Sequence, residues 1–183
     1  MIAVLDASPL CYLVLIGEID LLPHLFTRIL VPETVILELQ HANAPAVVRE
    51  WASNLPMWIS VDNTPHSIPL SMVKLQAGER AAILLAESIK ADIVVIDERA
   101  ARLIAEQRGL SVTGVLGVIG EAATQGRLDL TIAIDRLRLT SFRYSPGLLR
   151  AVLERYGRPR LKLQWTILGV RVWPHQLLLR FSA

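Results

Sequence analysis

Two apolar runs in this sequence each end in an aspartate, and a helical pattern follows each of them at once. Residues 2–5 lead into Asp6, and residues 93–96 lead into Asp97. Continuous apolar runs of this kind are typical of strands that are buried on both faces, as in parallel sheets. Ser8 is a good N-cap residue and Pro9 suits the first helical position, so we expect the first helix to begin there. Ligand crevices form at the carboxyl ends of parallel strands, which makes both aspartates candidate site residues.

Strand and helix patterns alternate along most of the chain. The patterns predict strands over 2–5, 28–31, 58–61, 92–97 and 111–113, and helices over 9–16, 19–26, 33–41, 44–55, 78–90, 98–108, 114–125, 130–139 and 146–156. Two prolines mark residues 63–70 as a loop. This alternation predicts an α/β protein with a parallel central sheet between two layers of helices, a three-layer α/β/α fold.

The composition suits one domain with a large core. The chain has 183 residues, of which 52% are hydrophobic, and its mean hydropathy is +0.43. Charged residues interrupt each apolar run before it reaches the roughly 18 residues that a membrane helix needs, so we expect no membrane span. The first residues form a strand pattern without a basic leader, so we expect no secretory signal. The single cysteine, Cys11, is expected in core packing, and a reducing, cytoplasmic location fits best.

The charge is unevenly distributed between residues 1–157 and a basic C-terminal extension, 158–183. The extension contains no acidic residue and five basic ones: Arg158, Arg160, Lys162, Arg171 and Arg180. Residues 1–157 carry a small net negative charge, which gives no general indication of nucleic-acid binding. In the extension, apolar residues alternate with polar ones, a pattern compatible with a hairpin, an added edge strand, a partner-binding arm or a poorly ordered segment.

Two glutamates fall on helix faces that should be buried. Glu38 lies on the apolar stripe of the helix over 33–41, together with Ala42, and Glu79 lies on that of the helix over 78–90. A buried carboxylate is costly unless it is paired or bound to a cation. Each acid also has an ordinary explanation, since Asp6 and Asp97 could cap helices and Glu79 could complement a helix dipole. Four such coincidences at one sheet edge are harder to explain separately.

Four acids without a matching set of histidines or cysteines favour a hard cation such as Mg²⁺ or Mn²⁺. A carboxylate cluster that holds such ions is suited to phosphodiester hydrolysis, because the ion activates water and neutralises phosphate charge. The sequence contains no phosphate-binding loop of the Gly-x-x-x-x-Gly-Lys type and no dinucleotide fingerprint after a strand. These observations predict a metal-dependent nuclease and disfavour a nucleotide-cofactor enzyme.

Four segments of the chain carry a resemblance to a known family. They are Asp6-Ala7-Ser8-Pro9-Leu10, Val31-Pro32-x-x-Val35-x-x-Glu38-Leu39, Gly78-Glu79-x-x-Ala82-Ile83-x-Leu85-Ala86 and Ile96-Asp97-Glu98-x-Ala100-Ala101-Arg102. In this order they resemble PIN-domain proteins, in the branch related to VapC-type toxins. The resemblance covers residues 1–157 and implies a PIN-like domain there. The extension from Arg158 has no counterpart in it.

The resemblance implies a Mg²⁺- or Mn²⁺-dependent endoribonuclease, often the toxin of a toxin–antitoxin pair, bound by a small antitoxin and often a homodimer. By position, Asp6, Glu38, Glu79 and Asp97 match the family's catalytic, metal-binding quartet. Glu98 stands where this branch often has a second aspartate and is a further candidate ligand. For the RNA substrate, we expect phosphate contacts from the neighbouring basic residues, which are Arg102, Arg99 and Arg80.

Two other functions stay open. A PIN-like domain without activity could serve as a binding module for RNA or a protein partner, and the glutamate at position 98 and the basic extension leave room for this. A phosphoacceptor receiver domain would need an acceptor such as Asp62 at the third strand and a lysine at a late strand end, and no such lysine is evident. The metal-dependent ribonuclease, cutting single-stranded or loop RNA, is the leading hypothesis.

Overall fold

The computed structural model describes residues 1–63, 69 and 72–157. The basic extension at 158–183 and most of the loop expected over 63–70 lie outside the described residues. Within them, each expected strand and helix is present, with ends within two residues of the predicted bounds.

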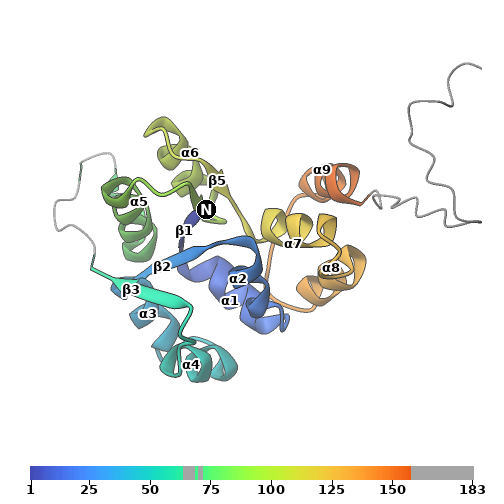
Figure 1. The fold of residues 1–183 in the computed structure, drawn as a ribbon, viewed down its shortest axis with the longest axis horizontal. Helices are drawn as coiled ribbons and strands as arrows, with labels where there is room; N and C mark the ends of the chain where they lie inside the picture. The colour runs from blue at the N-terminus through green and yellow to red at the C-terminus, as the bar shows by residue number, and fades with distance from the viewer. Residues whose placement is uncertain (64–68, 70–71, 158–183) are drawn as a thin grey trace, which may run out of the picture.

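A five-stranded sheet forms the centre of the molecule (Figure 1). Its strands are β1 (Ile2–Leu5), β2 (Arg28–Pro32), β3 (Ile59–Asp62), β4 (Ile93–Val95) and β5 (Val112–Thr113). Their order across the sheet is β3-β2-β1-β4-β5, and every neighbouring pair is parallel. The fold class predicted from the sequence is confirmed. Because β1 and β4 are neighbours, the aspartates that follow them leave the sheet at the same edge.

Helices and a 3₁₀ turn, η1, connect the strands within the described residues. These are α1 (Ala7–Leu15), η1 (Ile19–Leu21), α2 (Leu22–Leu25), α3 (Glu33–Gln40), α4 (Ala46–Ser53), α5 (Ala77–Ile89), α6 (Arg99–Gln107), α7 (Val115–Thr124), α8 (Leu130–Arg138) and α9 (Pro146–Tyr156). Within the described ranges, no single helix is long and apolar enough to cross a membrane, although α1 and the η1–α2 segment, bent by 114°, pass that test as a pair.

The sheet separates two hydrophobic cores. The larger core takes residues from α1, α3, α4, α7 and α8, and the smaller one from α5 and α6. Alternation along the strands divides the side chains between them: Leu5 and Val95 enter the larger core, whereas Val4 and Ile96 enter the smaller one. This arrangement is the predicted three-layer α/β/α architecture. Cys11 is half-buried and packs against the larger core.

The structure corrects two local expectations. The first helix begins at Ala7 rather than after Ser8, because Asp6 has extended backbone angles (φ −87°, ψ 168°) and itself occupies the N-cap position. In α3 the buried stripe consists of Val35, Ile36 and Leu39, while Ala42 lies beyond the end of the helix and is exposed. Glu38 is therefore half-buried at the edge of the stripe.

Candidate metal centre

Asp6 is a buried carboxylate at the carboxyl end of the central strand. Its side chain is 3% exposed, and its backbone N–H donates to the carbonyl of Val95, 3.0 Å away. Burial and the carboxylates of Glu79 and Glu38 together raise the pKa of Asp6 from 3.8 to about 7, against the lowering effect of the nearby backbone N–H groups. Asp6 is thus held among other negative charges with little access to water.

Glu79 is the second buried acid and lies in the first turn of α5. It is 6% exposed, and its Oε2 accepts a hydrogen bond from the backbone N–H of Gln76 at 2.9 Å. This bond satisfies a free N–H at the helix start. Burial nevertheless raises the pKa of Glu79, and the carboxylates of Glu98 and Glu38 also raise it.

Glu38 connects α3 to the start of α5. Its Oε1 accepts a hydrogen bond from the backbone N–H of Gly78 at 2.8 Å. The approach is so close that a Cβ atom at position 78 would lie 2.5 Å from the other carboxylate oxygen of Glu38. Gly78 precedes Glu79 directly, so this contact brings Glu38 to the same corner of the molecule as the two buried acids.

Asp97 lies two residues beyond β4, beside the start of α7. Its Oδ1 accepts a hydrogen bond from the backbone N–H of Val115 at 2.9 Å, while its Oδ2 is buried and has no partner among the described residues. Burial raises the pKa of Asp97 to about 6, although the Val115 N–H and the guanidinium of Arg102 both lower it. A buried carboxylate oxygen without a hydrogen bond is rare in native proteins and points to a missing partner.

The four predicted acids form two groups at one edge of the sheet. The carboxylates of Glu79 and Glu38 raise the pKa of Asp6, and that of Glu38 also raises the pKa of Glu79, whereas the charged group that acts on Asp97 is Arg102. The strand register explains this separation: Leu5 pairs with Val95, so Asp97 comes one residue later along its strand than Asp6 and falls on the opposite side of the sheet. Within residues 1–63, 69 and 72–157, no three potential ligands are arranged as a ready-made metal site.

The donor chemistry nevertheless fits an oxygen-ligated divalent ion. Three carboxylates that repel one another are held close together, two of them almost without solvent, and a fourth has an unpartnered oxygen. Protonation or a cation would relieve both problems. The acids are therefore suited to such an ion as a set, although a shared ligand shell among them stays a prediction.

The chain matches a known protein family. A family model described as a PIN domain covers residues 2–158, and no curated protein matches the chain significantly. The chain belongs to the PIN-domain family. PIN domains are typically nucleases and usually use divalent metal ions, which agrees with the acids described above. The match does not distinguish the VapC-type branch from the rest of the family.

In this PIN domain the three arginines predicted to contact the RNA substrate have different environments. Arg102 lies beside Asp97, and its Nη1 donates to the carbonyl of Ile96 at 3.2 Å. Arg80 is half-buried, donates to the carbonyl of Leu75 and lowers the pKa of Glu79, so its contacts lie within the protein. Arg99 is exposed at the first position of α6.

Glu98, the other candidate ligand, occupies the N-cap position of α6 and is exposed. Its backbone carbonyl accepts a hydrogen bond from the N–H of Arg102 at 3.0 Å. The carboxylate raises the pKa of Glu79, so it adds negative charge close to the buried acids. Glu98 therefore lies close to the cluster, and its part in metal binding is a prediction.

A cleft of about 460 Å³ adjoins Asp97. Arg99 and Arg102 line it, as do two arginines that the sequence motifs did not indicate, Arg143 before α9 and Arg155 within it. Neither lies near an acidic motif in the sequence. Their place in the cleft follows from the packing of α9 against α7, which lie side by side in Figure 1.

Proposed function

We propose that this PIN domain is a Mg²⁺- or Mn²⁺-dependent endoribonuclease that cuts single-stranded or loop RNA. The observation that carries the proposal is the burial of Asp6 and Glu79 beside Glu38 at the carboxyl edge of the sheet, with Asp97 and its unpartnered oxygen at the same edge. Like charges in a poorly solvated place destabilise a fold unless a ligand neutralises them. The family membership supports the same chemistry.

Asp6, Glu38, Glu79 and Asp97 would hold the metal. A divalent ion bound there would lower the pKa of a bound water and neutralise negative charge on a phosphodiester. The protein's own part is to keep these carboxylates in place: the Gly78 N–H orients Glu38, and the Val115 N–H fixes one oxygen of Asp97 and leaves the other available. Arg102, next to Asp97, would contact a phosphate oxygen of the RNA.

We further propose that the enzyme acts as the toxin of a toxin–antitoxin pair. A small antitoxin would bind it, it would work as a homodimer, and it would be located in the cytoplasm. The support is the sequence resemblance to VapC-type toxins and the absence of a single membrane-spanning helix within the described residues. Co-expression with a small protein encoded by the adjacent gene would test this role, since growth should stop without that protein and resume with it.

A second function has one observation in its favour. Glu38 and Asp97 each already use an oxygen to bind a backbone N–H, and the described residues contain no preformed metal site. A PIN-like domain without catalytic activity, which binds RNA or a protein partner, would tolerate such an arrangement. It would not require the buried acids to respond to metal.

Cleavage of a defined RNA separates the two functions. The wild-type protein should cleave it with Mg²⁺ or Mn²⁺ and stop when EDTA is added. Asp6→Asn should lose at least 100-fold in rate while the protein stays folded, a size typical of removing one essential catalytic group. Asp20→Asn, the same change at an exposed acid in η1, is the matched control and should cleave normally. Equal cleavage by both variants would refute the assignment.

A further inference from the structure

Arginines from two distant parts of the chain line the cleft beside Asp97. One wall carries Arg99 and Arg102 from α6, and another carries Arg143 and Arg155 from the α8–α9 segment and α9. The described lining residues include these four arginines and one acid, Asp97, so the cleft carries a net positive charge. Residues 1–157 as a whole carry a small net negative charge. A local concentration of positive charge in a concave site attracts and orients anions.

Three of these arginines are free to bind an anion. Within the described part of the chain, Arg99, Arg143 and Arg155 form no ion pair, and all three are exposed. The ion pairs there involve other arginines, at positions 108, 136 and 138. Unpaired guanidinium groups that converge on one cleft fit phosphate groups, which they can bind with two parallel hydrogen bonds.

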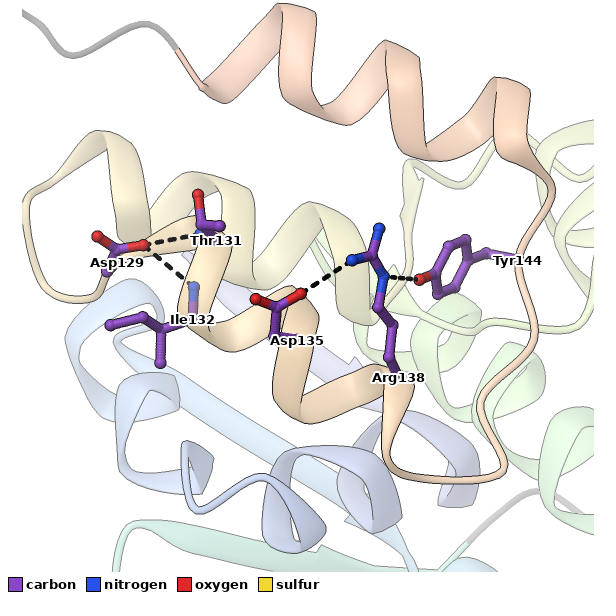
Figure 2. Close-up of polar contacts among 6 residues, drawn as sticks. All are labelled: Asp129, Thr131, Ile132, Asp135, Arg138 and Tyr144. Atoms are coloured by element: carbon purple, nitrogen blue, oxygen red, sulfur yellow. Dashed lines mark hydrogen bonds and ion pairs between the residues drawn. The ribbon is translucent and has the colours of Figure 1, made fainter.

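The wall that presents Arg143 is fixed on both sides of that residue. Before it, the ring of Phe142 packs edge-on against Tyr12, with 4.8 Å between centroids. After it, the hydroxyl of Tyr144 accepts a hydrogen bond from Nε of Arg138 at 3.0 Å, and Arg138 is paired with Asp135 at 2.9 Å (Figure 2). The backbone at Arg143 therefore has a defined position at the cleft.

The helix α8, which carries Asp135 and Arg138, is also held at its start. The Oδ1 of Asp129 accepts hydrogen bonds from the backbone N–H groups of Thr131, at 2.8 Å, and Ile132, at 3.1 Å (Figure 2). This N-cap satisfies donors that the helix leaves free. The segment that contains Arg143 therefore follows a helix whose start is capped.

The wall that presents Arg155 is equally well defined. The guanidinium of Arg155 lies over the ring of Tyr156, 5.2 Å from its centroid. That ring packs against Gly120 of α7 so closely that a Cβ atom there would lie 2.4 Å from it. Because Tyr156 is held against α7, the guanidinium stacked on it is also directed to the cleft.

We infer that the cleft binds one strand of nucleic acid, whose phosphates contact Arg99, Arg143 and Arg155 as the strand passes Asp97. The cleft volume of about 460 Å³ is that of a small-ligand site, which suits a flexible single strand better than a duplex. Phe142 and Tyr156 line the cleft but pack against other residues, so the inference rests on the arginines. This inference rests on the proposed nuclease function and assigns α9 a part in holding its substrate.

Binding of a labelled single-stranded RNA, measured by fluorescence anisotropy in EDTA, tests the inference without cleavage. Arg143→Ala and Arg155→Ala should each weaken binding about 5- to 10-fold and reduce the slope of log affinity against log salt by about 0.7. Arg150→Ala is the matched control, since this exposed arginine of α9 lines a different hollow, and it should change affinity less than twofold. Arg143→Lys should retain most of the affinity because it keeps the charge.

Equal affinities for Arg143→Ala, Arg155→Ala and Arg150→Ala would overturn the inference. Displacement of the RNA by polyglutamate as readily as by unlabelled RNA would also overturn it, since the cleft would then bind acidic polymers in general. The outcome is separable from the nuclease proposal. If the wild-type protein cleaves RNA but the arginine variants bind normally, the inference alone fails. If the wild-type protein does not cleave RNA but the arginine variants lose binding, only the nuclease proposal fails.

Discussion

Glu38 on α3 and Gly78 at the start of α5 are joined by a hydrogen bond of 2.8 Å from the glycine N–H to the carboxylate. The two helices belong to different layers, since α3 packs into the larger core and α5 into the smaller one. The bond therefore connects the layers across the carboxyl edge of the sheet. It also holds a third carboxylate beside Asp6 and Glu79, where its charge raises the pKa of both.

Gly78→Ala should separate Glu38 from this cluster. A Cβ atom would meet the Glu38 carboxylate at 2.5 Å, so that flexible side chain should move away and lose its hydrogen bond, at a cost of about 1.5–3 kcal/mol. The better helix propensity of alanine offsets up to about 1 kcal/mol of this. Stabilisation by Mn²⁺ in a thermal melt should fall at the same time.

Gly147→Ala is the matched control for that variant. Gly147 has the corresponding position in the first turn of α9, and a Cβ there would meet only Ser145 Oγ, at 4.0 Å. This substitution should raise stability by up to about 1 kcal/mol and leave the response to Mn²⁺ unchanged. If the two glycine variants behave alike, the Glu38–Gly78 contact has no special part in the site.

The raised pKa of Asp6 predicts that metal-free protein is more stable in mild acid than above neutrality. The folded state binds this proton with a pKa of about 7, compared with 3.8 ordinarily, so charging Asp6 destabilises the fold at high pH. This penalty is complete above about pH 7 and disappears as the pH falls toward 4. The full effect is on the order of 4 kcal/mol if the neighbouring carboxylates do not rearrange.

Asp6→Asn should remove most of this pH dependence. In EDTA at a pH above neutrality, the variant should be more stable than the wild-type protein, because it buries no charge. Urea unfolding across the pH range measures the difference, with Asp20→Asn as the control that keeps the wild-type profile. If stability changes with pH in the same way in Asp6→Asn and in the wild-type protein, the buried charge of Asp6 does not cause the pH dependence.

The packing of α9 on α7 depends on a single small residue. At Gly120 a Cβ atom would lie 2.4–2.7 Å from the ring of Tyr156, and neither the helix backbone nor the ring can easily move. Gly120→Ala should therefore cost about 1–3 kcal/mol and increase amide hydrogen exchange in α9. In a Tyr156→Ala background the same change should be neutral or stabilising. Equal costs in both backgrounds would contradict this account.

The sequence predicted those features that depend on local pattern. Strands buried on both faces are uniformly apolar, so their ends at Asp6 and Asp97 could be located, and the helical period placed Glu79 on a buried face. These positions, with the family resemblance, were sufficient to indicate the fold. The acids that the structure buries most deeply were among those indicated.

Contacts between distant segments were not predictable in this way. The bond between Glu38 and Gly78 spans 40 residues, and Asp97 is held by Val115, which follows the next strand. Arg143 and Arg155 belong to no acidic motif, and their place at the cleft depends on how α9 packs. The separation of Asp97 from the other acids results from strand register, which a pattern in one strand does not reveal.

The most direct test of the central claim is a calorimetric titration of metal-free protein with Mn²⁺. If the acids of both groups serve one site, the wild-type protein and Asp20→Asn should bind Mn²⁺ alike, while Asp6→Asn and Asp97→Asn should each lose at least tenfold in affinity. Equal Mn²⁺ binding by all four proteins, or loss in only one of the two site variants, would contradict the account.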